Sequence, residues 1–383
     1  MLRNLAKLGH DVELFVTGLS AQRYILDGIH VNVAPYPSLI RRLVNCKLIQ
    51  TVISRTHSKY GFSSLIVANP SMATYAKETI RSSDVVMIED RFQFFPMLYA
   101  KLYGKPCVMD LLGFSFLYLV RHIKSALKAP VVFLKMLPVI TMEILILLLS
   151  TKIVVVSKED KVGISKLLNV SPSTIDVITN GVDDEAFRPN EEQRKSIRLK
   201  YRIENEKIIV AFVGDLRSPH NFYAAKYIVN RLAPPIFERY SDKVYFLIVG
   251  PHDEIPDHFL RDKRIVFTNF VDSVVPYINA TDVCIAPLTQ GAGMKTKTLG
   301  YMACGKAVVT TTIGGEGLDL KNKQNAIICN IESMKDELIL LIEDEKMRKI
   351  LGWNARIKAS NYSWRRKALE LQKTLQEIIN KSM

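Results

Sequence analysis

The stretch Pro287-Leu-Thr-Gln-Gly-Ala-Gly-Met-Lys-Thr-Lys-Thr-Leu-Gly-Tyr-Met-Ala-Cys-Gly-Lys-Ala-Val-Val309 decides the fold. An apolar run over 283–287 leads into a Gly-x-Gly turn, a helical period over 294–304 follows, and a second apolar run covers 307–310. A strand, a glycine turn, a helix and another strand in this order predict a βαβ unit of a parallel sheet.

Similar apolar runs alternate with helical periods along the whole chain, and most of them are continuous, as in strands buried on both faces of a parallel sheet. The expected strands are 11–17, 84–89, 106–110, 152–157, 207–213, 244–249, 264–268, 283–287 and 307–310. Expected helices include 221–228, 294–304 and 333–343.

The pattern falls into two blocks, so we predict an α/β protein of two doubly wound, Rossmann-like domains. The break is expected in Ile178-Thr-Asn-Gly-Val-Asp183, where an Asn-Gly turn follows a short strand. The domains would be 1–180, joined by a C-terminal helix at 363–383, and 181–362. Because the chain starts inside a helix, the first domain is expected to lack its first strand.

The composition excludes several classes of protein. Of the 383 residues, 48% are hydrophobic and 23% charged, which excludes disorder and small disulfide scaffolds. Five scattered cysteines with no CxxC pair predict reduced thiols in a cytoplasmic protein, with no metal site. No nucleic-acid-binding motif is present.

The net charge of +14 is concentrated early: residues 1–180 hold 21 basic and 12 acidic side chains, net +9. An anionic surface or acidic ligand fits this excess, and the alternative is a basic enzyme with a solvated face. The apolar segment 131–149 contains Lys135 and Glu143, which disfavour insertion, so we expect a buried or surface-lying helix. With the basic segment 114–128, it predicts peripheral contact with an anionic membrane; the alternative is a crossover helix packed under the first sheet.

The Gly-x-Gly turn of the opening stretch suits a diphosphate. Gly291 and Gly293 would let the backbone approach a ligand, and the helix start offers free N–H groups to an anion. Lys295 and Lys297 add positive charge where the helix dipole disfavours it, so a bound anion explains them better than solvent does.

Two further glycine turns follow predicted strands. The first holds Gly214, Arg217 and Asn221, and its alternative is an ordinary loop capped by Asn221. The second is the run Thr311-Thr-Ile-Gly-Gly-Glu-Gly-Leu318, with Gly314, Gly315 and Glu316. All three turns lie at carboxyl ends of strands, where open α/β sheets bind ligands.

Together these residues resemble glycosyltransferases of the two-Rossmann-domain (GT-B) type, in the group 1 family (glycosyltransferase family four). The second half matches over nearly its whole length, and the first half more weakly through LGHDVELF15, SSDVVMIED90 and GKPCVMD110. The matching segments of the second half include VVVS157, ITNGVD183, FVGDL216, FLIVG250, NFVDSV274, ATDVCIAPL288, GAGMKTKTLGYMACGKAVVTT311, GGEGL318 and NYSW364.

The resemblance implies two domains facing a cleft and retaining, metal-independent transfer of a sugar from a nucleotide-sugar, with no cofactor. Lys295 and Lys297 would be catalytic by stabilising the departing diphosphate. Asp110 and Gly113 would lie on the acceptor side, facing a saccharide or lipid-linked acceptor, in a cytoplasmic protein on the inner face of the plasma membrane. The donor-binding positions would be Gly214, Arg217, Asn221, Val271, Gly291, Gly293, Met294, Thr298, Gly314, Gly315 and Glu316.

The chain departs from the family pattern at several positions. The family's two glutamates fall at Ala292 and Gly300, its first-domain histidine falls at Leu112, and its basic pair falls at Asp215 and Asn221. Loss of the second glutamate predicts weaker ribose binding. Gly300→Glu is expected to restore tighter binding. The alternatives are a catalytically silent nucleotide-sugar-binding relative and a nucleotide-sugar epimerase. The base, sugar, acceptor and linkage stay open.

Overall fold

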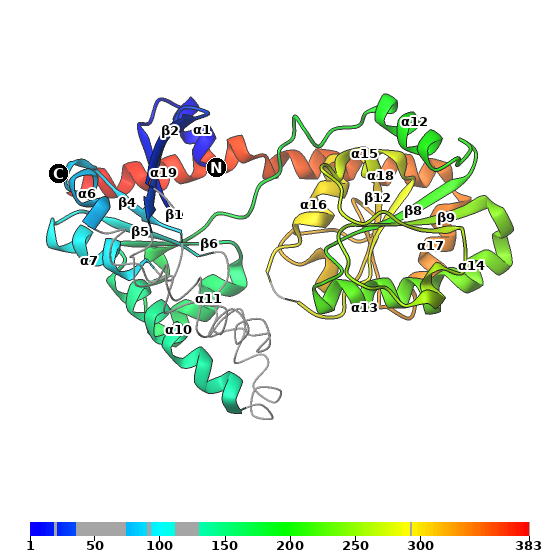
Figure 1. The fold of residues 1–383 in the computed structure, drawn as a ribbon, viewed down its shortest axis with the longest axis horizontal. Helices are drawn as coiled ribbons and strands as arrows, with labels where there is room; N and C mark the ends of the chain where they lie inside the picture. The colour runs from blue at the N-terminus through cyan, green and yellow to red at the C-terminus, as the bar shows by residue number, and fades with distance from the viewer. Residues whose placement is uncertain (19–20, 36–73, 90–92, 112–129, 292, 383) are drawn as a thin grey trace. The chain divides into compact units, whose positions relative to one another are not determined.

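The computed structural model describes residues 1–18, 21–35, 74–89, 93–111, 130–291 and 293–382. The chain divides into two compact units (Figure 1). Unit 1 comprises Met1–Thr179 and Lys367–Met383, and unit 2 comprises Asn180–Arg366.

Among its described residues, unit 2 contains a parallel six-stranded sheet in the order β10-β9-β8-β11-β12-β13. Successive residues of β8 face opposite layers: Val210 and Phe212 enter one apolar core, and Ile209 and Ala211 enter another. This explains the continuous apolar runs. The strands are β8 (Ile208–Val213), β9 (Val244–Val249), β10 (Ile265–Phe267), β11 (Val283–Ala286), β12 (Ala307–Thr310) and β13 (Ile327–Ile328).

Helices cover both faces of this sheet, with α13, α14 and α17 on one face and α12, α15, α16 and α18 on the other (Figure 1). They are α12 (Glu191–Lys200), α13 (Pro219–Tyr227), α14 (Ala233–Tyr240), α15 (Val275–Ala280), α16 (Thr296–Ala303), α17 (Met334–Glu343) and α18 (Glu345–Ala359). Shorter helical turns are η2 (Ile228–Leu232), η3 (Ser241–Lys243), η4 (Asp257–Leu260), η5 (Ile313–Gly315) and η6 (Ser360–Tyr362).

The strand order reverses between β8 and β11. From β8 the chain proceeds to β9 and β10 on one side, and from β11 to β12 and β13 on the other. The middle of β8 pairs with the first residues of β11, with Val210 opposite Val283 and Ala211 opposite Cys284, and the pairing does not continue to the carboxyl ends of the two strands. Such a reversal opens a crevice at the carboxyl edge of an α/β sheet, where ligands bind.

In the described part of unit 1, a parallel sheet has the order β4-β5-β6-β7. Helices α7, α10 and α11 pack on one face, and α1 and α19 pack on the other. The strands are β4 (Val86–Ile88), β5 (Cys107–Leu111), β6 (Lys152–Val155) and β7 (Ile175–Val177). The helices are α1 (Leu2–Lys7), α6 (Lys77–Ser82), α7 (Phe94–Leu102), α10 (Pro130–Leu149), α11 (Lys158–Leu168) and α19 (Trp364–Ser382). A short helical turn, η1 (Pro172–Thr174), precedes β7.

The first predicted strand, 11–17, exists as β1 (Val12–Gly18), but it belongs to a separate three-stranded sheet. Its partners are β3 (Ile29–Pro35), parallel to it, and β2 (Gln22–Leu26), antiparallel to β3. The sequence interpretation missed this hairpin, although Asp27 and Gly28 both have positive φ, 51° and 79°, as a tight Asp-Gly hairpin turn requires.

Helix α10 covers the apolar segment 131–149 as predicted. Its Ile146 and Leu147 are buried in the core of unit 1, and Glu143 is fully buried as well, while Leu145 and Leu148 are exposed. In the part of the chain that the structure describes, no helix is long and apolar enough to cross a membrane.

Candidate functional site

The loop after β8 and the start of α16 meet at Gly214. A Cβ atom on residue 214 would lie 2.8 Å from the Lys297 Nζ and 2.8 Å from the Asn221 side chain, so only glycine leaves both groups in place. Gly214 also donates its N–H to the Val249 carbonyl at 2.9 Å. The turn that holds Gly214 and Asn221 and the helix after the Gly-x-Gly turn are therefore brought together beyond the carboxyl end of β8.

Lys297 has a strongly lowered pKa. Its ammonium group donates to Asn221 Oδ1 and lies 4.6 Å from the ring centroid of Phe212. Burial, and after it the nearby charge of Lys295, lowers the pKa of Lys297 from 10.5 to about 7. An anion bound here would supply the missing negative charge and raise the pKa of Lys297 again.

Lys295 is the residue immediately before α16 and is only 8% exposed. Its Nζ donates to the Gly293 carbonyl at 2.7 Å and lies 3.3 Å from Glu316 Oε2, while its backbone N–H donates to the Glu316 carbonyl at 3.1 Å. Lys295 thus connects the Gly-x-Gly loop, the start of α16 and the Gly-Gly-Glu turn. A diphosphate that binds Lys295 competes with the Glu316 carboxylate.

The remaining predicted donor residues of this region support the loops. Thr298 is fully buried, and its hydroxyl donates to the Gly314 carbonyl at 2.7 Å. Gly315 donates its N–H to the Thr311 carbonyl at 3.1 Å. Met294 is buried in the core beneath α16. Gly291 and Gly293 have φ angles of 121° and 75°, as the tight turn requires, and Ala292 lies outside the described residues.

Two predicted donor residues lie in other surroundings. Arg217 is exposed and forms a two-pronged ion pair with Asp215, at 2.9 and 2.7 Å. Val271 packs, partly buried, against the apolar core formed by Leu247, Val249 and their neighbours.

The alternative role of Asn221 as a helix cap is wrong. Helix α13 begins at Pro219, and its N-cap residue is Ser218. Pro219 suits the first helical position because it needs no N–H partner. Asn221 lies in the first turn, where its side-chain amide donates to the Asp215 carbonyl at 2.9 Å and so closes the loop after β8.

On unit 1, Asp110 lies near the carboxyl end of β5 and is 7% exposed. Burial, followed by the nearby carboxylate of Glu89, raises the pKa of Asp110 to about 7, while the Met1 amino group opposes this shift. Gly113 and Leu112 lie outside the described residues.

Sequence reasoning missed two aromatic residues beside the donor loops. The Tyr301 hydroxyl accepts a hydrogen bond from the Val213 N–H at 2.7 Å, where β8 has separated from β11. Phe187 lies beside Gly300, so closely that a Cβ atom on residue 300 would be 2.9 Å from its ring. Their partners are 88 and 113 residues away in sequence, and no local pattern marks such contacts.

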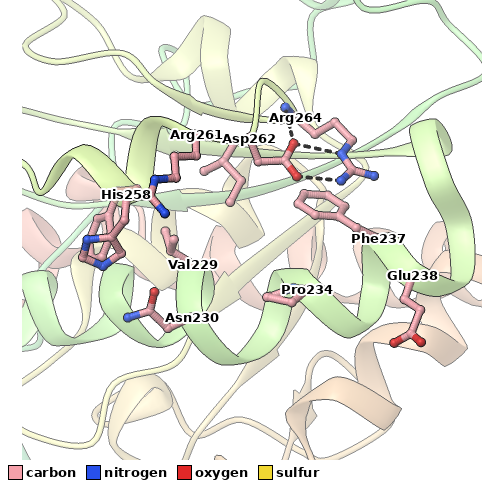
Figure 2. A pocket seen from close by; sticks show the side chains of 11 residues that line it. Val229, Asn230, Pro234, Phe237, Glu238, His258, Arg261, Asp262 and Arg264 are labelled. Carbon is pink, nitrogen blue, oxygen red and sulfur yellow. Dashed lines mark hydrogen bonds and ion pairs between the residues drawn. The ribbon is translucent and has the colours of Figure 1, made fainter.

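A groove of about 530 Å³ lies elsewhere in unit 2, between α14 and the turn before β10 (Figure 2). Arg264 lines it, but its guanidinium is paired with Asp262 at 2.6 Å and lies 3.8 Å from the Phe237 ring centroid. None of the predicted donor residues lines this groove. Arg264 therefore stabilises the edge of the sheet, and we place the candidate site at Lys295 and Lys297.

Residues 207–344 match the family model described as "Glycosyl transferases group 1". The match contains Gly214, Lys295, Lys297 and Glu316, the residues that meet at the crevice. Unit 2 carries a group 1 glycosyltransferase domain. Among the described residues, this domain and unit 1 hold no cluster of three or more His, Cys, Asp or Glu side chains that could bind a metal ion.

Two curated relatives extend the similarity beyond the glycosyltransferase domain. An uncharacterised glycosyltransferase of Methanocaldococcus jannaschii is 28% identical over 231 residues, 55% of either chain. The Escherichia coli UDP-Gal:α-D-GlcNAc-diphosphoundecaprenol α-1,3-galactosyltransferase is 28% identical over 282 residues, 68% of this chain and 66% of that one. The aligned part thus spans between half and two thirds of these relatives.

Solved structures confirm the predicted fold class. Sucrose-phosphate synthase of Thermosynechococcus elongatus has a TM-score of 0.73, with 13% identity, over 99% of this chain and 92% of that one. Anabaena HepE in complex with UDP has a TM-score of 0.67, with 14% identity, over 96% of this chain and all of that one. At this level of identity the likeness shows the fold alone: two Rossmann-like domains of the GT-B type.

Proposed function

We propose that the protein transfers a sugar from a nucleotide-sugar to a saccharide or a lipid-linked acceptor. The observation that carries the proposal is the convergence of Lys295, Lys297 and the glycine turns on the crevice between β8 and β11. Two lysines, one of them with a lowered pKa, form a site that a diphosphate would complete. The group 1 domain match and the names of the relatives support a glycosyl donor.

In this proposal the protein needs no metal ion and no cofactor. Lys295, Lys297 and the N–H groups at the start of α16 stabilise the negative charge that develops on the departing diphosphate. Because the pKa of Lys297 is about 7, its side chain is only partly charged near neutral pH, and it becomes fully charged as the anion binds. Transfer proceeds with retention of the anomeric configuration, as the resemblance to family four implies.

The acceptor is proposed to lie on unit 1, near Asp110 and Gly113. Two curated relatives carry names that describe transfer to a diphosphoundecaprenol-linked sugar, which supports a lipid-linked acceptor for this chain. The excess of 21 basic over 12 acidic side chains in residues 1–180 supports peripheral contact with an anionic membrane, from the cytoplasmic side.

The decisive experiment combines binding with transfer. The full chain is titrated calorimetrically with UDP, GDP, ADP and dTDP, and then incubated with the matching nucleotide-sugars and diphosphoundecaprenol-linked or free saccharide acceptors. Product anomers are assigned by NMR, and the reaction is repeated with a chelator. Retention and activity in chelator are expected; an inverted product or an absolute metal requirement would contradict the mechanism.

Lys295→Ala is expected to lower turnover by about 10²–10³-fold, because it removes a charged group aimed at the leaving group. Lys226→Ala is the matched control, since Lys226 is an exposed lysine near the end of α13. If Lys295→Ala keeps both the turnover and the nucleotide affinity of the native chain, the site assignment is wrong.

A second candidate function is nucleotide-sugar binding without transfer. Gly300 favours it, because the family's ribose-binding glutamate is replaced and Phe187 packs into the adjacent space. Tight binding of a nucleotide-sugar, with neither transfer to any acceptor nor hydrolysis, would support this candidate.

A further inference from the structure

Helix α18 presents two apolar faces. Its inner face buries Leu351, Ala355 and Ala359. Its outer face exposes Ile350, Trp353 and Ile357, whose residues are 61%, 66% and 54% accessible. These three positions are spaced i, i+3 and i+7, so they form one continuous line along the helix. We call this line the α18 stripe.

An exposed tryptophan between two exposed isoleucines is unusual on a soluble domain. Single exposed apolar residues need no explanation, but a contiguous apolar patch marks a contact with another molecule. Leu199 on α12 is an isolated case, 80% accessible, within the polar helix sequence EEQRKSIRLK. The α18 stripe differs from it because its members lie side by side on one helix face.

The charges around the α18 stripe are strongly positive. Residues 345–358 contain five basic side chains and one acidic side chain, Glu345, a net charge of +4. Lys349 pairs with Glu345 at 2.7 Å and Arg348 donates to the Leu341 and Ile342 carbonyls, and Lys346 and Arg356 supply the flanking positive charge. The loop beside the helix is held to it by Lys358 and Asp319 at 2.9 Å and by Asn354 and the Gln324 carbonyl at 2.9 Å. That loop adds Lys321 and Lys323 beside Asp319, and Lys323 lies 3.7 Å from Glu337.

This charge decides between the candidate occupants. A second copy of the chain, packed stripe to stripe about a twofold axis, would bring the same positive surfaces together, which disfavours association. An anionic bilayer surface attracts the lysines and arginines, and it accepts apolar side chains at the level of the lipid headgroups. Tryptophan favours this interface because its ring is apolar and its N–H is polar.

We propose that the α18 stripe is a docking surface for an anionic lipid bilayer. Ile350, Trp353 and Ile357 enter the boundary between headgroups and acyl chains, while the flanking Lys346 and Arg356 contact the lipid phosphates. This surface belongs to unit 2, and it is separate from the membrane contact proposed above for unit 1. It does not depend on the donor site or on sugar transfer.

The chain contains two tryptophans, Trp353 and Trp364, so a Trp364→Phe variant of the full chain reports on Trp353 alone. It is mixed with vesicles of phosphatidylcholine containing phosphatidylglycerol, or of phosphatidylcholine only. With the anionic vesicles we expect a blue shift of the emission and quenching by lipids brominated on the acyl chain. An unchanged Trp353 emission at vesicle concentrations that sediment the protein would overturn the proposal.

A second measurement uses co-sedimentation of chains with both tryptophans. Ile350→Ser combined with Ile357→Ser should lower the apparent affinity for anionic vesicles by about tenfold, since two apolar anchors are lost. Leu199→Ser is the matched control and should bind like the native chain. Equal losses in both variants, or dimerisation through the α18 stripe in place of vesicle binding, would refute the lipid assignment. Loss of vesicle binding with normal nucleotide affinity would leave the proposed function intact.

Discussion

The ammonium group of Lys297 lies against the backbone of Gly214, so that a Cβ atom on residue 214 would be 2.8 Å from it. The same Cβ would be 2.8 Å from the Asn221 side chain, which accepts a hydrogen bond from Lys297. One glycine therefore sets the position of a charged group that belongs to a distant part of the sequence.

Gly214→Ala tests this relationship. The added methyl group must displace Lys297, the flexible partner, from the crevice, and we expect nucleoside diphosphate affinity to fall by about tenfold or more. The fold should lose only about 1–3 kcal/mol, the usual cost of overpacking. Calorimetric titration measures the affinity, and urea unfolding measures the stability. Native affinity in a folded Gly214→Ala variant would show that the Lys297 position does not matter for binding.

The pKa of Lys297 predicts a proton uptake on binding. Because the pKa of the free site is about 7, much of Lys297 is uncharged at pH 8, and a bound diphosphate would raise the pKa and draw in a proton. Titrations at pH 8 in buffers of different ionisation enthalpy should therefore give different apparent binding enthalpies. Lys297→Met should abolish this buffer dependence; its persistence would assign the proton to another group.

The ionisation of Lys297 also affects the stability of the folded protein. The pKa of Lys297 is lowered in the folded chain, to about 7 from 10.5, so the unfolded chain binds more protons between these values. Stability of the ligand-free protein should therefore rise with pH from about 7 toward 10.5, and this pH dependence should level off below about 7, where Lys297 is protonated in both the folded and the unfolded chain. The difference between native and Lys297→Met stability, measured at several pH values, isolates this contribution.

Gly300→Glu is expected to behave differently from what the family pattern alone suggests. The sequence predicted tighter ribose binding, but a Cβ atom at residue 300 would lie 2.9 Å from the Phe187 ring. The single variant should thus be destabilised by about 1–3 kcal/mol. Phe187→Ala with Gly300→Glu should lose less stability than the two single changes added together, because the first change makes room for the second. Strict additivity would contradict the contact.

Tyr301→Phe removes the hydroxyl that accepts from the Val213 N–H. The buried N–H is then left without that partner, which should cost about 1–3 kcal/mol of unfolding free energy. The loop that begins at Gly214 would lose its fixed position, so the Michaelis constant for the donor should rise more than turnover falls. A change in stability with an unaltered Michaelis constant would limit Tyr301 to a role in the core.

The sequence alone determined five of the six strands that the structure describes in unit 2, all but β13, and the residues of the glycine turns. The strands 207–213, 244–249, 264–268, 283–287 and 307–310 were predicted to within two residues, because strands buried on both faces must be continuously apolar. The helix that follows the Gly-x-Gly turn was predicted for a similar reason, since glycine at positive φ and a helical period are local features. Local chemistry was sufficient for these elements.

Only the tertiary structure decided which groups meet. The hairpin of β2 and β3 was missed because all five residues of β2 are exposed and carry no apolar alternation. The contacts of Lys297 with Asn221 and of Tyr301 with Val213 join residues 76 and 88 positions apart. Phe187 contacts Gly300, which lies 113 positions later in the sequence. Such contacts depend on the strand order and on close packing of helix against sheet, which no local pattern of residues specifies.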